Sequence, residues 1–360
     1  MTLASVMEAI GENETLALGG LVIGLGFGML AQRSRFCLRS AVIETFHGKL
    51  GAKLAVWLLA FAAAVVLTQI FILLHVLDVG TARQLATRGT LSGALIGGAL
   101  FGVGMILARG CASRLLILAG TGNLRSLLSG LVFAVVAQAS LNGVLSPLRM
   151  TISNWWTIDG GSARNLLDLF HAGNGSGLVF GLAWLAGGIF FALRSKMGPA
   201  AILSGFGVGA MVACAWLLTY QIAIQAFDVA APVKSLSFTG PAADVLMLVL
   251  TPPGQPWNFD IGLVPGVFAG SFLAAFFAGE LKLQGFKDGL SMRRYMIGAA
   301  CMGFGGMLAG GCAVGAGVSG AAVFALTAWV TLSAMWAAAG LTDYLMDRPR
   351  AESLQTQPAH

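Results

Sequence analysis

The chain has 360 residues, of which 57% are apolar and only 10% are charged, and its mean hydropathy is +0.83. This composition excludes a soluble globular domain and predicts an integral membrane protein surrounded by a lipid bilayer. The formal net charge of +6 comes from basic residues that are dispersed between apolar blocks. Because they form no stripe interleaved with aromatic residues, the sequence predicts no nucleic-acid partner.

The apolar blocks, taken in chain order, predict an all-α fold with about nine transmembrane helices and with short re-entrant or broken helices between some of them. The first block is expected to be a retained span, since residues 1–19 contain three Glu and no Lys or Arg and so lack the basic region of a secretory signal. The nine predicted spans are Leu18 to Ala31, Leu54 to Leu77, Leu91 to Ala108, Leu127 to Leu148, Gly177 to Leu193, Ala200 to Tyr220, Gly262 to Gly279, Arg294 to Ala309 and Ser319 to Leu341.

One apolar stretch is too long for a single span. No Asp, Glu, Lys or Arg occurs in the forty-seven residues from Met296 to Thr342. As one helix this stretch would be about 70 Å long, more than twice the thickness of the bilayer core. We therefore expect the chain to turn back at the glycine-rich segment around Cys312, where glycine disfavours a continuous helix and leaves backbone groups free to line a cavity.

A glycine-rich run that ends in cysteine occurs twice, as GVGMILARGCAS through Cys111 and as GFGGMLAGGCAV through Cys312. With further matching glycines, it predicts a first transport repeat at 15–195 and a second at 199–345, flanked by tails at 1–14 and 346–360. Repeats of this kind are typical of transporters whose site lies where two broken helices meet. Close helix packing through small residues is an alternative explanation for the same glycines.

The loops between the predicted spans are charged unequally. Sixteen of the twenty-one Lys and Arg residues fall on the side away from the N-terminus. The positive-inside rule then predicts an extracytoplasmic N-terminal tail and a cytoplasmic C-terminal tail, and with this topology the two repeats are inverted. The five basic residues on the N-terminal side are Arg83, Arg88, Arg149, Arg164 and Lys234.

Three of the five cysteines are candidates for a functional site. Cys37 lies in QRSRFCLRS and Cys111 in LARGCASR, so both have arginine neighbours, whereas Cys312 has glycine neighbours. Cys214 and Cys301 lie within ordinary apolar blocks and are interpreted as small packing residues. A packing role does not explain why Cys111 and Cys312 recur at the same place in two glycine-rich runs.

Arginine near these cysteines indicates an anionic substrate. An arginine at the centre of a membrane helix costs at least about 2.5 to 3.5 kcal/mol unless it is paired or hydrated, and few carboxylates lie nearby in sequence. We expect an anion to complete the site, oriented by Arg109 and by backbone N–H groups at the helix starts after Cys111 and Cys312. Solvated loop charges are the alternative explanation for Arg33 and Arg35. The predicted substrate-binding residues are Cys37, Cys111, Cys312, Arg109, Arg33, Arg35, Arg114, Gly110 and Gly311.

Cysteine and arginine without a carboxylate cluster or a histidine array suit a small anion with a soft end. Thiosulfate fits this description, because its sulfonate end suits arginine and N–H donors while its terminal sulfur is a polarisable acceptor for an S–H group. The cysteines are expected to act as neutral thiols, since a thiolate would repel a dianion. The sequence alone does not determine their protonation.

Two other function classes remain open. A membrane sulfurtransferase would need a nucleophilic thiolate that forms a persulfide, and no CxxC pair or adjacent base supports one. A metal transporter would need clustered ligands, whereas His47, His75, His171 and His360 are scattered. We therefore predict a transporter rather than an enzyme, with no cofactor and no metal. The ATP-binding pattern GxxxxGK[ST] is absent, and coupling to protons, to sodium or to intracellular consumption stays open.

The same motifs carry a family resemblance. GLGFGMLAQRSRFCLRSA, GVGMILARGCASRLLILAGTGNLRSL and GFGGMLAGGCAVGAGVSG resemble those of the YeeE/YedE family of bacterial sulfur-transport membrane proteins. The resemblance implies an hourglass-like helical fold in the bacterial inner membrane, with inverted repeats and with Cys37, Cys111 and Cys312 passing thiosulfate inward. It also implies a small cytoplasmic partner that resembles the TusA sulfur carriers. Some relatives are linked to selenium, and the resemblance leaves the role of the segment Gln221 to Asp260 open.

Overall fold

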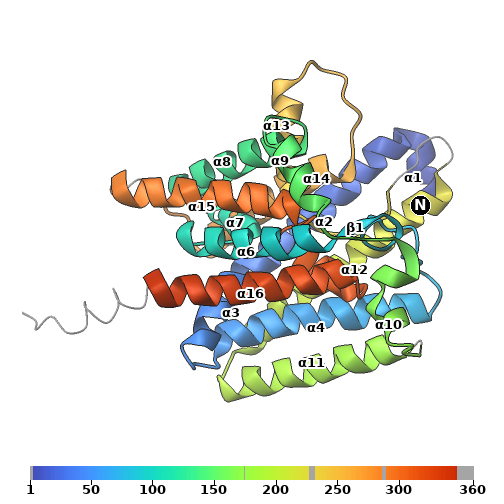
Figure 1. Cartoon of the computed structure of the whole chain (residues 1–360), viewed down its shortest axis with the longest axis horizontal. Coiled ribbons are helices and arrows are strands. Elements are labelled where there is room, and N and C mark those ends of the chain that lie inside the picture. Colours follow the sequence, from blue (N-terminus) through green and yellow to red (C-terminus); the bar gives the residue numbers. More distant parts are fainter. Residues whose placement is uncertain (1–2, 174, 227–231, 286–288, 347–360) are drawn as a thin grey trace, which may run out of the picture.

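The computed structural model describes residues 3–173, 175–226, 232–285 and 289–346, and these form a bundle of long helices (Figure 1). Seven segments are long and apolar enough to cross a membrane. The chain is therefore an all-α, multi-pass membrane protein, as its composition predicts. All but the first residue of the predicted tail at 346–360 lies outside the described residues. The seven segments are Glu12–Phe46, Ala52–Leu73, Leu91–Gly120, Leu124–Leu141, Ser176–Arg194, Pro199–Gln225 and Phe259–Phe277.

The elements follow one another in this order: α1 (Leu3–Ile10), α2 (Glu12–Ser34), α3 (Leu38–Phe46), α4 (Ala52–Leu73), α5 (Arg83–Ala86), β1 (Gly89–Thr90), α6 (Leu91–Leu107), α7 (Ala112–Gly120), α8 (Leu124–Leu141), α9 (Ser146–Ser153), β2 (Thr157–Ile158), the 3₁₀ turn η1 (Gly161–Arg164), α10 (Leu166–Leu169), α11 (Ser176–Arg194), α12 (Pro199–Gln225), α13 (Thr239–Leu250), α14 (Phe259–Phe277), α15 (Gly289–Leu308), the π-helical turn η2 (Gly315–Gly320) and α16 (Leu326–Met346). The two short strands pair antiparallel.

Each predicted span overlaps a long helix, but two of the predicted spans extend well beyond the helix that they overlap. The span predicted from Leu127 to Leu148 is wrong at its end, because α8 ends at Leu141 and the separate helix α9 begins near Pro147. Proline is well tolerated in the first turn of a helix and breaks a helix interior, which explains the new start. The block from Ser319 begins too early, because η2 and the left-handed Phe324 (φ 54°) precede α16.

Close backbone contacts at glycine hold two helix pairs together, α2 with α14 and α12 with α4. Gly28 of α2 lies against the backbone of Val267 and Ser271 on α14, and Gly209 of α12 lies against Ala60 and Ala64 on α4. The contacts advance in the same direction along both helices of each pair, so the helices of each pair run parallel. Small residues let membrane helices approach closely enough for extensive van der Waals contact. These glycine contacts therefore fit the alternative explanation given for the glycines, which is close packing of membrane helices through small residues.

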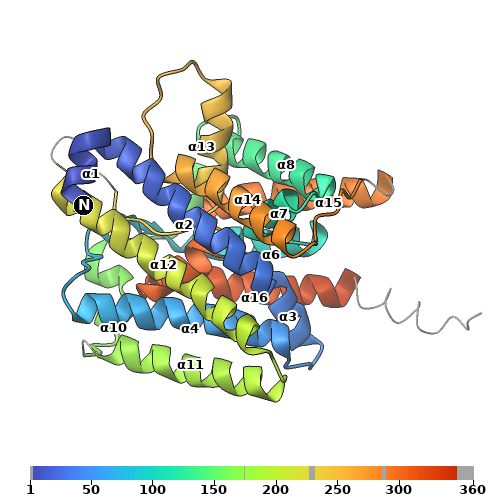
Figure 2. The same ribbon diagram turned by 180° about the vertical axis from the view of Figure 1, so that it is seen from behind.

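Two other pairs run antiparallel. On α6 and α15, Gly97 lies against Gly305 while Gly104 lies against Gly298. On α2 and α12, a side chain at Gly26 would meet Met211, and one at Gly207 would meet Leu30. In Figure 2, which views the molecule from behind, α2, α12 and α14 lie on the side nearest the viewer.

Gly28→Leu is expected to destabilise the folded protein by about 1 to 3 kcal/mol. The new side chain would clash with backbone atoms of α14, and backbone atoms cannot relieve a clash by changing rotamer as a side chain can. Gly187→Leu on α11 is the matched control, since a Cβ at Gly187 meets nothing within 4 Å. Thermal unfolding of both variants in detergent, with the yield of monodisperse protein, measures the difference. Equal unfolding temperatures for the two variants would contradict the packing account.

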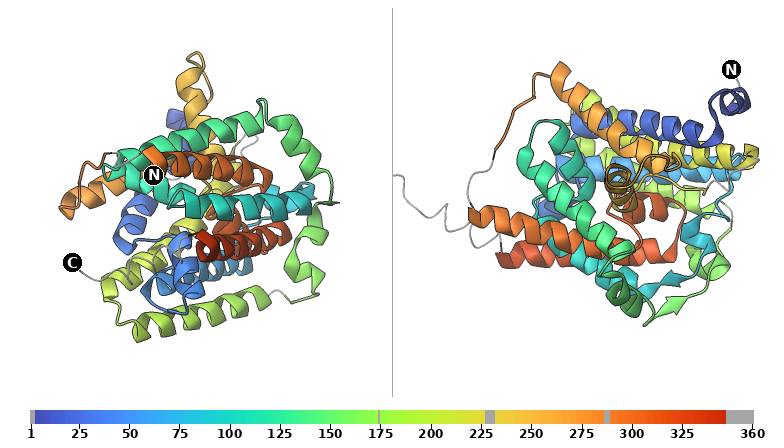
Figure 3. Two further views of the ribbon diagram at one scale, coloured as in Figure 1. Left: turned by 60° about the vertical axis from the view of Figure 1, so that its left-hand side comes forward. Right: turned by 90° about the horizontal axis from the view of Figure 1, so that it is seen from above.

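The bundle has two distinct ends, which Figure 3 shows from two further sides. At the β1 end, on the right of Figure 1, α2 and α6 begin and α15 stops. At the α3 end, on the left, α2 and α6 stop and α16 finishes. The chain turns back at the β1 end between α15 and α16, at the glycine-rich segment that the sequence indicates.

Candidate functional site

The three candidate cysteines occupy the same kind of turn. In each, a helix ends, one residue adopts a left-handed backbone conformation, and the cysteine follows two residues later. The left-handed residues are Arg35 (φ 54°), Arg109 (φ 56°) and Gly310 (φ 80°), and they precede Cys37, Cys111 and Cys312. Left-handed backbone is uncommon outside glycine, so its recurrence at two arginines marks these turns as special features of the fold.

Each cysteine also stands at the start of the next helical segment. The Gly315 N–H donates to Cys312 Sγ at 3.4 Å. The N–H groups of Ser40 and Arg114, also three residues on, lie near the sulfurs of Cys37 and Cys111 without completing a cap hydrogen bond. The first N–H groups of a helix lack partners inside the helix and attract anions. All three turns therefore present a thiol beside backbone donors.

The two predicted site glycines differ in how strictly they are required. A Cβ at Gly311 would lie 2.8 Å from the backbone nitrogen of Ala316, so this position excludes a side chain unless the turn moves. A Cβ at Gly110 would meet only Leu115 Cδ2 at 3.3 Å, which a small shift of that side chain relieves.

Cys37 and Cys111 form a pair. Both residues are buried, and their side chains lie close enough to act on each other electrostatically. Cys111 Sγ also lies 3.4 Å from the hydroxyl oxygen of Ser113. The structure therefore places two buried thiols next to each other.

Cys312 lies toward the β1 end, because its neighbours Gly311 and Gly315 line a cavity that also holds residues of that end. Buried aromatic side chains connect this region with the Cys37 turn. The ring of Phe27 lies 6.4 Å from that of Phe36, next to Cys37, and 5.4 Å from that of Phe238 in the segment along the cavity. The structure thus places Cys37 next to Cys111. Packed aromatic side chains connect the Cys37 turn with the region around Cys312.

A network of polar contacts surrounds Glu280 at the α3 end. Arg35 forms an ion pair with Glu280 at 3.5 Å, and Gln32 donates to the same carboxylate at 3.0 Å. Arg114 in turn donates to the side-chain oxygen of Gln32 at 3.4 Å. Arg114 also lies close enough to act electrostatically on Cys37. Arg35 and Arg114, two of the predicted site arginines, therefore belong to one polar network at the α3 end, near the thiol pair.

The other two predicted arginines are exposed. Arg33 lines a cavity of about 590 Å³ at the α3 end, together with Gln32 and Glu280. Arg109 extends over the ring of Tyr295, with its guanidinium carbon 6.0 Å from the ring centre. Its role in orienting an anion stays a prediction, and Arg114 is the arginine that the structure brings nearest to the thiol pair.

The sequence interpretation missed a basic vestibule at the β1 end. Two adjoining cavities of about 220 and 340 Å³ share Arg83, Arg149, Gly310 and Gly315 in their walls. Arg88 and Arg164 line the first cavity and Lys234 lines the second. All five basic residues that the sequence assigned only to loops on the N-terminal side therefore gather beside the Cys312 turn.

Two of these arginines are packed into the protein. Arg164 is 6% exposed and donates to the backbone oxygens of Arg83 and Thr87 and to the Thr327 hydroxyl. Burial, with the neighbouring charge of Arg83, lowers the pKa of Arg164 and of Arg149. No carboxylate lies in ion-pair contact with Arg83, Arg149 or Arg164 among the salt bridges of the described residues. An anion in the vestibule would supply the missing negative charge.

Residues 33–341 match the protein family described as "Sulphur transport". The chain belongs to this sulphur-transport family. The match confirms the resemblance to YeeE/YedE proteins drawn from the three motifs. As a family member the chain is a transporter and not an enzyme.

Two relatives in the sulphur-transport family are similar along almost their whole length. The thiosulfate transporter TsuA of Spirochaeta thermophila is 28% identical over 338 residues, which cover 86% of this chain and 93% of the relative. The thiosulfate transporter TsuA of Escherichia coli is 25% identical over 339 residues, which cover 88% and 91%.

Proposed function

We propose that this chain carries thiosulfate across the bacterial inner membrane, from the basic vestibule to the α3 end, along a path that includes Cys312, Cys111 and Cys37. The observation that carries the proposal is the vestibule itself, where unpaired guanidinium groups surround a cavity beside a cysteine turn. Two relatives that match over most of the chain are named for the same substrate.

The substrate's two ends suit the two kinds of group in the path. Arginine and backbone N–H groups bind the sulfonate oxygens, and charge-assisted bonds of this type are the strong ones. The terminal sulfur then accepts weak hydrogen bonds from the thiols. A relay of this kind needs thiols that keep their protons, and the close approach of the buried Cys37 and Cys111 supplies two thiols next to each other.

The charge distribution supports the orientation. We assign the β1 end to the periplasm, because its vestibule holds only five of the twenty-one basic residues, and the α3 end to the cytoplasm. The N-terminus is then periplasmic and the C-terminus cytoplasmic. A TusA-like sulfur carrier would receive the substrate at the α3 end.

Reciprocal contacts support two inverted repeats. Gly102 of α6 lies against Met335 on α16, and Gly303, its counterpart 201 residues later on α15, lies against Phe133 on α8. The counterpart helices α6 and α15 run antiparallel, as inversion requires. The two cysteine turns that follow these helices then enter from opposite ends.

Growth tests the proposed function. A bacterial strain without its own sulfate and thiosulfate uptake is expected to grow on thiosulfate as sole sulfur source when it produces this chain, and not with an empty vector. Failure of a correctly inserted protein to support growth would favour another sulfur or selenium species. Accumulation of a persulfide on a cysteine, detected by mass spectrometry during uptake, would instead favour the membrane sulfurtransferase.

A further inference from the structure

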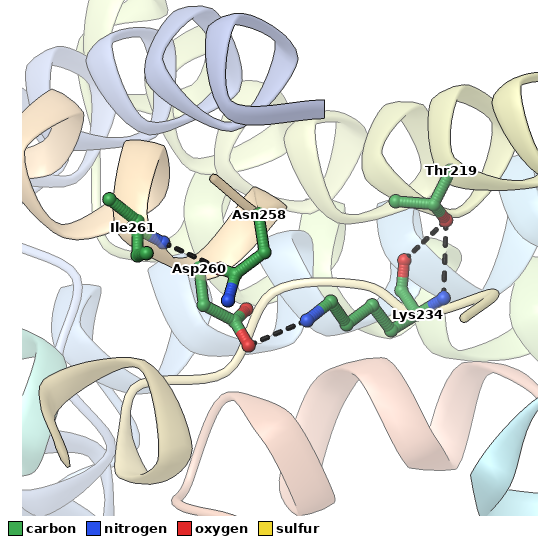
Figure 4. A network of polar contacts seen from close by, with 5 residues as sticks. All are labelled: Thr219, Lys234, Asn258, Asp260 and Ile261. Atoms are coloured by element: carbon green, nitrogen blue, oxygen red, sulfur yellow. Dashed lines mark hydrogen bonds and ion pairs between the residues drawn. The ribbon is translucent and has the colours of Figure 1, made fainter. Parts of the chain in front are cut away.

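The larger vestibule cavity also contains a carboxylate cluster that the anion path does not explain. Lys234 Nζ donates to Asp260 Oδ2 at 2.6 Å, and Figure 4 shows this ion pair. Asp244 lies in the wall of the same cavity, close enough to Asp260 for the two carboxylates to interact electrostatically. The cavity therefore brings two carboxylates together within a site whose other charges are basic.

The surrounding elements hold this cluster in place. The Thr219 hydroxyl on α12 donates to the backbone oxygen of Lys234 at 2.6 Å and accepts from its N–H at 3.2 Å (Figure 4). The Asn258 side chain caps α14 by accepting from the Ile261 N–H at 3.0 Å, which fixes the helix turn that carries Asp260. The described residues from Pro232 to Asp260, part of the segment whose role the family resemblance leaves open, thus contribute one wall of the larger vestibule cavity.

The charged groups that line the cavity together with Asp244 come from four elements. They are Lys234 in the extended segment before α13, Asp260 on α14, Arg83 on α5 and Arg149 on α9. The parts of α8 and α15 that line the cavity carry no charge, being Leu141, Gly306 and Met307. Thr239 also lines the cavity, and its hydroxyl is buried without a hydrogen-bond partner within the described residues.

We propose that Asp244 controls the affinity of the vestibule for its anionic substrate by binding a proton together with the anion. This proposal rests on the proposed function. The ion pair already neutralises Asp260, so Asp244 is the remaining negative charge that opposes a dianion in the cavity. A proton on Asp244 removes this repulsion, and by reciprocity the bound anion favours that proton.

The position of Asp244 makes the control effective near neutral pH. Asp244 lies on α13, a 12-residue helix that is not one of the spanning segments. Burial and the Asp260 charge raise the pKa of Asp244 to about 6. Bound anion raises this pKa further, so affinity is highest below the pKa of the free protein and falls as the pH rises above it. An acidic exterior would therefore load the vestibule.

Thiosulfate affinity of the purified full-length protein, measured calorimetrically at pH 6 and pH 8, tests the proposal. Thiosulfate stays a dianion over this range. The parent protein is expected to bind about fivefold more weakly at pH 8 than at pH 6, which corresponds to an anion-induced rise of one unit from a free pKa of about 6 for Asp244. Asp244→Asn is expected to bind with the same affinity at both pH values, at least as tightly as the parent does at pH 6.

The outcomes separate this inference from the proposed function. No thiosulfate binding by the parent at either pH would contradict the proposed function itself. Equal binding by the parent at both pH values, or an unchanged pH dependence in Asp244→Asn, would overturn the role of Asp244 alone. A second measurement needs only the parent protein: binding heats at pH 7 in two buffers of different ionisation enthalpy are expected to report net proton uptake, and no uptake would overturn the proposal.

Discussion

Replacing Cys111 by alanine is expected to lower thiosulfate uptake by about tenfold or more. Cys111 is the thiol that contacts Cys37, so the variant removes one S–H donor and leaves its partner without a neighbour in the path. A hydrogen bond to a charged group contributes about 1.5 to 3 kcal/mol, and each 1.4 kcal/mol is a factor of ten. Initial uptake rates in cells, corrected for the amount of protein in the membrane, measure the effect.

Cys214→Ala on α12 is the matched control for Cys111→Ala, because Cys214 belongs to none of the three cysteine turns. It is expected to retain the parent rate. Cys111→Ser keeps a hydroxyl donor in place of the thiol, so intermediate activity in this variant would show that hydrogen-bond donation is part of the role. Uptake at the parent rate by Cys111→Ala would mean that Cys111 is a packing residue.

Arg83→Gln is expected to raise the KM for thiosulfate by about tenfold to a hundredfold. Arg83 lines both vestibule cavities, and its charge acts on Arg149 and Arg164. The loss of one charge-assisted bond to the anion, about 1.5 to 3 kcal/mol, gives this range. The Arg83 side chain is exposed, and its only hydrogen bond to the described residues is one of 3.3 Å to Gly310 O, so the fold should tolerate the change.

Uptake rates over a range of thiosulfate concentrations measure the KM of Arg83→Gln. Arg194→Gln is its control, since Arg194 is also an exposed arginine but ends α11 at the α3 end. The control is expected to keep the parent KM. A KM of Arg83→Gln equal to that of the parent would show that the vestibule does not capture the substrate.

Much of the architecture could be predicted from the sequence because membrane helices leave a direct signal in composition. Length and hydropathy located every long helix, and glycine content located the turn around Cys312. The errors arose where local chemistry overrides hydropathy. Pro147 starts a new helix inside an apolar block, and the π-helical turn delays α16 although it contains no charged residue.

The site was predicted less completely. The cysteine motifs are contiguous in sequence, so their importance was visible, and the pairing of Cys37 with Cys111 follows from two turns that only the fold brings together. The vestibule leaves no such pattern, because its basic residues lie one or two at a time in loops separated by whole helices. Arg149 and Arg164 resemble ordinary loop charges until the structure shows Arg149 half-buried and Arg164 buried beside the Gly310 turn.

Uptake of radiolabelled thiosulfate into liposomes that contain only this purified protein tests the central claim most directly. The account predicts that label enters these liposomes and not protein-free ones, and that an excess of unlabelled thiosulfate blocks entry far better than sulfate, which lacks the soft terminal sulfur. Entry no faster than into protein-free liposomes, with protein shown to be inserted and folded, would contradict it.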